Sequence, residues 1–310
     1  MGYGSSLFST YSIVARDPQT GEIGGAVQTH QMCVGSIVLW MLPGRGALAT
    51  QSLVNISYGP IALAMLREGV APERIITALA ASDADAHRRQ MGLVDAQGRA
   101  AAWTGEGCIR EAGHRTGRDF SVQANMMTRP TVVEAMAAAF GAARGDLAAR
   151  LMAAMEAAQA EGGDIRGMQS AALRIVPGDR NVPDWTTIYD LRVDEHEEPL
   201  KELGRLVRMR RALVLDDRGA ERLAAGQREE ALRLWAQARA EAPELEEIPF
   251  WQAVALADQQ DDIETAAAIL RPALADDPRR AHWIDLIDRL AECGLIKRAD
   301  AAERLKAALA

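Results

Sequence analysis

The chain has 310 residues, of which 48% are hydrophobic and 25% charged, and its formal net charge is -8. This length suffices for one sizeable core and a second unit, and the excess of 43 acidic over 35 basic residues argues against a nucleic-acid-binding surface. No basic region followed by an apolar core occurs in the first thirty residues, and no uninterrupted apolar stretch of 18 residues occurs anywhere, so we expect a cytoplasmic protein that does not enter membranes.

The first predicted elements form a β-hairpin. A strand beginning at Thr10 leads into the turn 16–21, which contains Asp17, Pro18 and Gly21, and a second strand follows over 23–28. Apolar and β-branched runs predict further strands over 33–40, 47–51, 90–94, 100–103, 120–126, 170–176 and 186–193. Helical periodicity predicts helices over 61–66, 72–79, 130–140 and 146–160. This order favours an α+β fold in which helices cover two packed antiparallel sheets.

From about Glu197 onward the pattern is helical throughout. Apolar residues at helical spacing over 200–213 predict one long amphipathic helix. An internal repeat follows, because Ala231, Leu234 and Pro243 recur 35 positions later as Ala266, Ile269 and Pro278. The segment resembles tetratricopeptide repeats, although a generic helical extension fits it as well. We therefore predict an α+β domain over 1–214 and a helical, repeat-like domain over 215–310, with assembly into a homo-oligomer such as a dimer through the apolar helical tail.

Many short segments in the first two thirds of the chain carry a specific resemblance. They are S-I-V-A-R-D-P at 12–18, A-V-Q at 26–28, A-T-Q-S-L-V-N-I-S-Y-G-P at 49–60, G-L-V-D-A-Q-G-R at 92–99, T-G-E-G-C-I at 104–109, A-G-H-R at 112–115, Q-A-N-M at 123–126, G-G-D-I-R-G-M-Q-S-A-A-L at 162–173 and D-L-R-V-D-E-H at 190–196. In order and spacing they resemble the bacterial proteins grouped as domain of unknown function 1028. The resemblance implies an N-terminal-nucleophile (Ntn) hydrolase-like fold, a four-layer αββα sandwich. It implies no substrate.

Thr10 is the candidate nucleophile. The threonine that the family carries just after its initiator methionine corresponds to Thr10, two residues before the Ser-Ile-Val-Ala run. In an Ntn enzyme the threonine hydroxyl attacks a carbonyl and the threonine's own α-amine accepts the proton. Here nine residues precede Thr10, so its amine is free only if the Ser9–Thr10 bond is cleaved. The alternative is that Thr10 merely opens a strand as a β-branched residue.

Further candidates accompany Thr10. Two more catalytic candidates are Asp17, for charge stabilisation, and Asn125, whose amide is able to donate to an oxyanion. The substrate-binding candidates are Gln28, Gln51, Asn55, Tyr58, Arg166, Gln169 and Ser170. Purely structural roles for these residues stay open. Asp17 is equally suited to forming the turn before Pro18, and the amides are suited to capping turns. Tyr58 is suited to filling a helix start, and Arg166 to pairing with Asp164 or Glu161.

Other chemistries find little support in the sequence. Cys33, Cys108 and Cys293 lack metal or disulfide spacing, the histidines form no metal motif, and no phosphate-binding glycine loop occurs. We therefore expect no cofactor and no metal. Two hypotheses remain: an Ntn-type amidohydrolase or peptidase acting on a small amide or peptide, and a non-catalytic binding or scaffold protein whose helical tail recruits a partner.

Overall fold

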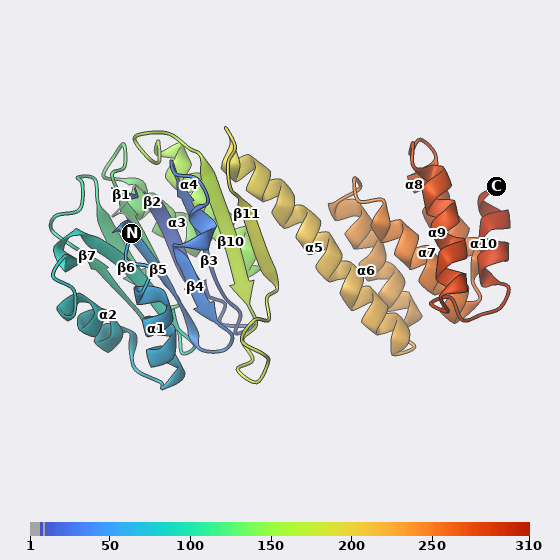
Figure 1. The fold of residues 1–310 in the computed structure, drawn as a ribbon, viewed down its shortest axis with the longest axis horizontal. Helices are drawn as coiled ribbons and strands as arrows, with labels where there is room; N and C mark the ends of the chain where they lie inside the picture. Colours follow the sequence, from blue (N-terminus) through green and yellow to red (C-terminus); the bar gives the residue numbers. More distant parts are fainter. Residues whose placement is uncertain (1–6, 9) are drawn as a thin grey trace. The chain divides into compact units, whose positions relative to one another are not determined.

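The chain folds into two compact units, the first ending at Val207 and the second spanning Arg208–Ala310. The computed structural model describes residues 7, 8 and 10–310 (Figure 1). The first unit combines two antiparallel sheets with helices, and the second is helical. The prediction of a mixed α and β region with antiparallel sheets, followed by a helical region, is confirmed.

The two sheets are built from eleven strands of the described residues. The first sheet contains β1 (Leu7–Phe8), β4 (Leu39–Leu42), β5 (Gly46–Leu53), β6 (Arg89–Asp95) and β7 (Ala100–Thr104), in the order β1-β5-β6-β7 with β4 also on β5. The second sheet has the order β11-β10-β3-β2-β9-β8. Its strands are β2 (Thr10–Arg16), β3 (Ile23–Thr29), β8 (Gly113–Gly117), β9 (Phe120–Asn125), β10 (Ser170–Val176) and β11 (Tyr189–Val193).

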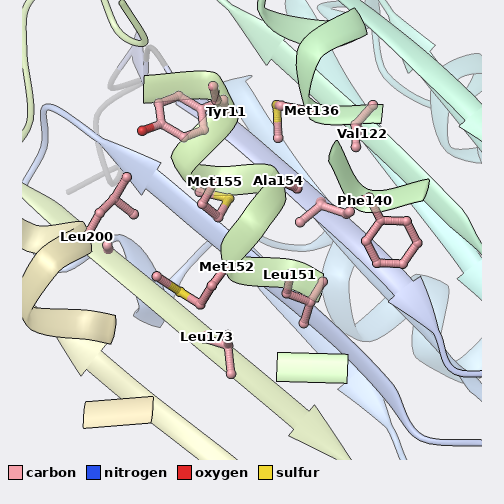
Figure 2. Packing of buried hydrophobic residues seen from close by; sticks show 14 of the residues in the cluster. Tyr11, Val122, Met136, Phe140, Leu151, Met152, Ala154, Met155, Leu173 and Leu200 are labelled. Atoms are coloured by element: carbon pink, nitrogen blue, oxygen red, sulfur yellow. The ribbon is translucent and has the colours of Figure 1, made fainter. Parts of the chain in front are cut away.

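Helices cover one face of each sheet. Helices α1 (Tyr58–Arg67) and α2 (Pro72–Ala81) pack on the first sheet through a core that includes Leu48 and Leu93. Helices α3 (Val132–Ala142) and α4 (Leu147–Ala160) cover the second sheet, where Tyr11, Met155 and Leu173 lie in one buried cluster (Figure 2). Removing this much apolar surface from water is the main force that holds the helices on the sheets.

The opposite faces of the two sheets pack against each other. Side chains alternate between the two faces of a strand, so β2 sends Tyr11 toward α4 and Val14 toward the first sheet. Val14 and Val27 meet Ala47 and Ala49 of β5 in an apolar core between the sheets. Toward the end of the second sheet where β2 begins, the residues on this inner face become polar.

The structure corrects two details of the predicted strands. Residues 33–38 are not a strand, because Cys33 has a left-handed φ of 61° and a 3₁₀ turn follows over Val34–Ser36. Only β4 remains from the strand predicted over 33–40. Strand β8 was not predicted, since its sequence Gly-His-Arg-Thr-Gly offers no apolar alternation.

The second unit consists of packed helices. The division between the units falls inside α5 (Pro199–Ala224). The helices after it are α6 (Arg228–Glu241), α7 (Glu247–Gln260), α8 (Ile263–Leu274), α9 (Arg280–Glu292) and α10 (Ala301–Leu309). The repeat-related Ala231 and Ala266 lie in α6 and α8 and are both fully buried, in one core with Trp235 and Phe250. Across the described part of the chain, no helix combines the length and apolarity needed to cross a bilayer.

Candidate functional site

Thr10 is the first residue of β2 and lies in a row of polar residues that crosses four strands. It pairs with Asn125 of β9 and with Thr29 of β3, and Thr29 pairs in turn with Ser170 of β10. Directly paired residues share a face, and Val14 of the same alternation in β2 belongs to the core between the sheets. The row therefore faces the first sheet. All four polar residues are at most 1% exposed.

Side chains of the first sheet bind this row. The Gln51 side-chain nitrogen donates to the Thr10 carbonyl oxygen at 3.1 Å and to Gln90 Oε1 at 2.7 Å. Asn125 Nδ2 also donates to Gln90 Oε1, at 3.0 Å, and Ser12 Oγ donates to Gln51 Oε1 at 2.6 Å. These bonds join the two sheets. Burying an amide without a partner costs several kcal/mol (about 2–7), so their mutual pairing explains how so many polar groups are tolerated here.

We call this group the inter-sheet polar cluster. Its members are Thr10, Ser12, Thr29, Gln51, Gln90, Gln123, Asn125 and Ser170. All eight side chains are uncharged, so a free α-amine on Thr10 would be the one titratable group among them. A buried hydroxyl whose surroundings are fixed by amides is chemically suited to acyl transfer, because the hydroxyl supplies a nucleophile.

Thr10 itself is held by its backbone. Its hydroxyl lies 3.4 Å from the Thr29 hydroxyl, whereas its carbonyl oxygen accepts from Gln51 at 3.1 Å and from Asn125 at 3.4 Å. Its nitrogen belongs to the peptide bond with Ser9, and Ser9 lies outside the described residues. The geometry thus fixes Thr10 at the junction of the two sheets, with its nitrogen engaged in the chain.

A glycine makes room for the cluster. Gly92 of β6 faces Gln123, and a Cβ atom at Gly92 would lie 1.9 Å from Gln123 Oε1 and 2.6 Å from Ser121 Oγ. Gln123 uses this space to donate to Ser12 Oγ at 2.6 Å and to accept from Ser121 Oγ at 2.9 Å. The packing of the two sheets at this point therefore requires a residue without a side chain.

The cluster connects to a histidine at its edge. Gln90 Nε2 donates to Thr104 Oγ1 at 2.9 Å, and Thr104 Oγ1 lies 2.8 Å from His114 Nδ1. Desolvation lowers the pKa of His114 below its ordinary value, so this imidazole favours the neutral form. His114 reaches Thr10 only through intervening side chains.

Asp17 lies apart from Thr10. It follows the other end of β2, about 23 Å from Thr10 at about 3.3 Å per strand residue, where its carboxylate accepts from the backbone nitrogens of Gln19 at 2.7 Å and Thr20 at 3.2 Å. Arg150 of α4 lies 3.6 Å away. The structure thus places Asp17 in the turn-forming role and does not bring it into the cluster.

Near the start of α1, Asn55 and Tyr58 share one hydrogen-bond partner, Asp83. Three groups donate to Asp83 Oδ2: Asn55 Nδ2 at 3.1 Å, the Tyr58 hydroxyl at 2.8 Å and Arg89 Nε at 2.9 Å. Burial by itself would raise the pKa of Asp83, but these hydrogen bonds outweigh it and lower the pKa below its ordinary value. No hydrogen bond described in the structure joins these residues to Thr10. Their network fixes α1 to the segment after α2.

The loop before β10 holds the next candidates. Arg166 pairs with Asp164 at 3.0 Å, and the fully buried Asp164 carboxylate also accepts from the His30 nitrogen at 2.9 Å. Of the alternatives for Arg166, the structure shows the pair with Asp164. The Gln169 backbone nitrogen donates to the Thr29 carbonyl at 3.1 Å, which places the start of β10 beside the cluster. Gln169 is half-buried.

Gln28 lies on the other face of the second sheet. It pairs with Tyr11 and Ala171, both of which belong to the core under α4. Gln28 is fully buried, and neither atom of its amide has a hydrogen-bond partner among the described residues. Tyr11 donates its hydroxyl to Gln159 at 3.0 Å. Gln28 is therefore separated from Thr10 by the sheet itself.

Of the predicted residues, the structure brings Thr10, Gln51, Asn125 and Ser170 together. Sequence reasoning missed Ser12, Thr29, Gln90 and Gln123. A signal was present in β9, where Ser121, Gln123 and Asn125 alternate with apolar residues inside a strand that is otherwise buried. Polar residues at period two in a strand covered on both faces indicate a polar layer.

Exposed apolar side chains surround this end of the sandwich. Met32, Ile56, Ile109 and Ile165 are 56%, 40%, 39% and 62% exposed. Met32 follows the end of β3 and Ile56 the end of β5, while Ile109 and Ile165 lie in the loops next to Met126, which bonds to the backbone of both. We call these four residues the apolar rim.

Within the described ranges, no group of three or more His, Cys, Asp and Glu residues is placed to hold a metal ion.

Comparisons with known proteins agree on the first unit. The family model described as "Family of unknown function (DUF1028)" matches residues 10–203. The crystal structure of protein SPO2555 from Silicibacter pomeroyi, described with the same family, is 34% identical, with a TM-score of 0.58, and the match covers 65% of this chain and 88% of that chain.

A more distant match is Anbu (ancestral beta-subunit) from Yersinia bercovieri, at 12% identity and a TM-score of 0.33, covering 62% of this chain and 90% of that chain. No curated protein matches the chain. The family model matches residues 10–203, which is more than half of the chain. The chain therefore belongs to the family of unknown function DUF1028.

Proposed function

We propose that the first unit is an Ntn-type amidohydrolase or peptidase whose nucleophile is Thr10, freed by cleavage of the Ser9–Thr10 bond. The observation that carries this proposal is the position of Thr10: it begins a strand between two antiparallel sheets, in a fully buried cluster of hydroxyls and amides. The layering of helices outside both sheets supports the four-layer Ntn architecture.

The processing step uses the Thr10 hydroxyl. Its oxygen attacks the Ser9 carbonyl carbon, the bond from that carbon to the Thr10 nitrogen breaks, and the hydroxyl proton passes to the nitrogen. Water then hydrolyses the resulting ester, which leaves a carboxylate on Ser9 and a free amine and hydroxyl on Thr10. That amine is the base for later cycles.

Gln51 and Asn125 supply hydrogen-bond donors in this proposal. Their side-chain nitrogens are directed at the Thr10 backbone, at 3.1 and 3.4 Å, and they are already fixed by bonds to Gln90. An amide nitrogen carries two hydrogens, and these bonds use both hydrogens on each residue. The two side chains therefore hold the nucleophile in place.

Hydrolysis of a panel of small amides and peptides tests the activity. We expect the incubated full chain to release amine, Thr10→Ser to retain part of the activity, and Thr10→Ala to have none. Thr20→Ala, which changes a threonine in the hairpin turn away from the cluster, serves as the matched control and should match the parent. Equal rates for Thr10→Ala and the parent would contradict the proposal.

A second candidate is a non-catalytic binding or scaffold protein whose helical unit recruits a partner. The observation favouring it is an exposed aromatic group: Trp251 is 45% exposed and stacks edge-on against Phe250 at 5.2 Å between ring centroids. Phe250 in turn packs against Trp283 at 4.9 Å. On this alternative the chain keeps its residues before Thr10, and Trp251→Ala weakens partner binding while leaving the first unit unchanged.

A further inference from the structure

Strand β1 occupies an edge of β5 just before the candidate site. Leu7 pairs with Leu53, and Phe8 pairs with Ser52, in antiparallel register. The other edge of β5 is taken by β6, which pairs with Ser52 through Arg89. On the β1 edge, β4 covers β5 only as far as Ala49. The backbone of Ser52 and Leu53 is therefore an edge that the chain's own N-terminal strand fills.

The chain changes sheet immediately after β1. Phe8 belongs to the first sheet and Thr10 to the second, so the Ser9–Thr10 bond follows directly on the residues paired with β5. Gln51, the neighbour of Ser52 in β5, donates to the Thr10 carbonyl at 3.1 Å. The filled edge of β5 thus lies next to Gln51, the residue that bonds to the candidate nucleophile.

We propose that the β5 edge at Ser52–Leu53 is a binding slot for an extended peptide, which adds to the sheet as a short antiparallel strand. Backbone hydrogen bonds supply affinity in this mode of recognition, and side-chain positions supply selectivity. In the intact chain the slot holds Leu7–Phe8. After removal of that segment it holds the acyl side of a peptide substrate.

The assignment to substrate rests on the function proposed above and follows from its chemistry. Cleavage of Ser9–Thr10 leaves residues up to Ser9 attached to the Thr10 oxygen as an ester. Attack of Thr10 on a peptide in trans gives the same kind of ester, carried by the same oxygen. The acyl groups of both esters then leave Thr10 on the same side, and Leu7–Phe8 on β5 mark that side for the first one.

The chain's own sequence indicates the class of peptide. The residues preceding the bond are Leu7, Phe8 and Ser9, two large apolar residues followed by a small one. Ile56, 40% exposed in the segment after β5, belongs to the apolar rim on this end of the unit. We expect peptides with large apolar residues two and three positions before the cleaved bond, and a small residue next to it.

The backbone of β5 is strained where the slot begins. Ser52 has a left-handed φ of 67° although it is not glycine. Such conformations persist only where neighbouring structure determines them, and they recur at ligand-binding positions. Ser52 is paired on both edges, by β1 and by β6, which is consistent with a slot that is shaped for an occupant.

Peptide binding to full-length variants tests the slot. All chains carry Thr10→Ala, so that no cleavage occurs, and the probe is a fluorescent peptide with the sequence of residues 2–9. The double variant Leu7→Pro/Phe8→Pro removes both backbone donors of β1, so its slot should be open. We expect it to bind the peptide at least about tenfold more tightly than the Thr10→Ala parent, whose own strand competes at an effective concentration on the order of mM.

Two controls make the result specific. The same peptide methylated on the Leu and Phe nitrogens keeps its side chains but lacks the donors, and should bind at least about tenfold more weakly. Leu7→Gly/Phe8→Gly is a second way to empty the slot if the proline variant fails to fold, since glycine disfavours the strand. Folding is checked by circular dichroism.

Equal affinity of parent and emptied variants, or equal affinity of the methylated and unmethylated peptides, would overturn the slot. Because the chains carry Thr10→Ala, this measurement is independent of catalysis. An inactive wild-type chain that still passes the binding test would refute the proposed hydrolase and keep the slot. An active chain that fails the binding test would do the reverse.

Discussion

Gly92 lies opposite Gln123 in the inter-sheet polar cluster, and its replacement by alanine tests whether the cluster is packed as described. The added Cβ would lie 1.9 Å from Gln123 Oε1, so the Gln123 side chain has to move. Its bonds to Ser12 at 2.6 Å and from Ser121 at 2.9 Å are then lost. Leaving a buried polar group unpaired costs about 1–3 kcal/mol, so the loss of these two bonds should destabilise the first unit of Gly92→Ala by about 2–6 kcal/mol.

Gly141→Ala is the matched control. Gly141 lies in α3, and a Cβ there would meet nothing within 4 Å. Alanine in an exposed helix position stabilises relative to glycine by about 0.5–1 kcal/mol. The same chemical change is therefore expected to have opposite signs at the two positions.

Urea unfolding followed by hydrogen exchange measures both variants. Peptides covering β2 and β9 report on the first unit alone, which matters because a chain of two units need not unfold in one step. A loss of less than about 0.5 kcal/mol for Gly92→Ala, within the range of ordinary surface substitutions, would refute the packing of Gln123 against β6.

Three further predictions concern stability. Asp83→Asn should destabilise the first unit at pH 7. Hydrogen bonds, chiefly from Arg89, lower the folded pKa of Asp83 below its ordinary 3.8 despite burial, so the stabilisation by Asp83 is present above about pH 4 and is lost as the pH falls further. Urea midpoints from pH 3 to 7 that fall in parallel for variant and parent would contradict this. The effect of Asp216 on stability has the opposite sign, because burial raises its folded pKa to about 6. The charged carboxylate destabilises the second unit above pH 6, and this destabilisation fades toward pH 4. Asp216→Asn should therefore stabilise the second unit at pH 7 and flatten the pH dependence of its stability, and an unchanged pH profile would argue against this. Gly219→Ala should destabilise the second unit by about 1–3 kcal/mol, since its Cβ would lie 2.3 Å from the Trp235 ring; tryptophan fluorescence during thermal unfolding measures this, and an unchanged midpoint would count against the packing.

Local patterns in the sequence predicted most of the first unit. The strand expected over 170–176 matches β10. The turn-forming role of Asp17 was one of the two roles that the sequence left open, and it is the role that the structure shows. The strand expected over 33–40 was wrong because Val34 and Val38 are buried between the sheets, and burial alone gives a loop the same apolar composition as a strand.

The candidate site was only partly predictable. Thr10 and Asn125 were singled out from the resemblance and from their residue types, and they are direct partners in the second sheet. Gln90 was missed because its role depends on how two sheets face each other, and Gln123 because the alternation in β9 marks a polar layer without showing which strand that layer faces. That relation joins strands that are distant in sequence, and no spacing along the chain encodes it.

The proposed hydrolase requires that Thr10 becomes the first residue of the mature chain. Intact mass and N-terminal sequencing of the purified full-length protein after long incubation test it most directly, with Thr10→Ala treated in parallel. We expect the parent to lose the mass of residues 1–9 and to begin at Thr10, while Thr10→Ala keeps them. A parent chain that still begins at Met1 or Gly2 would refute the Thr10 mechanism.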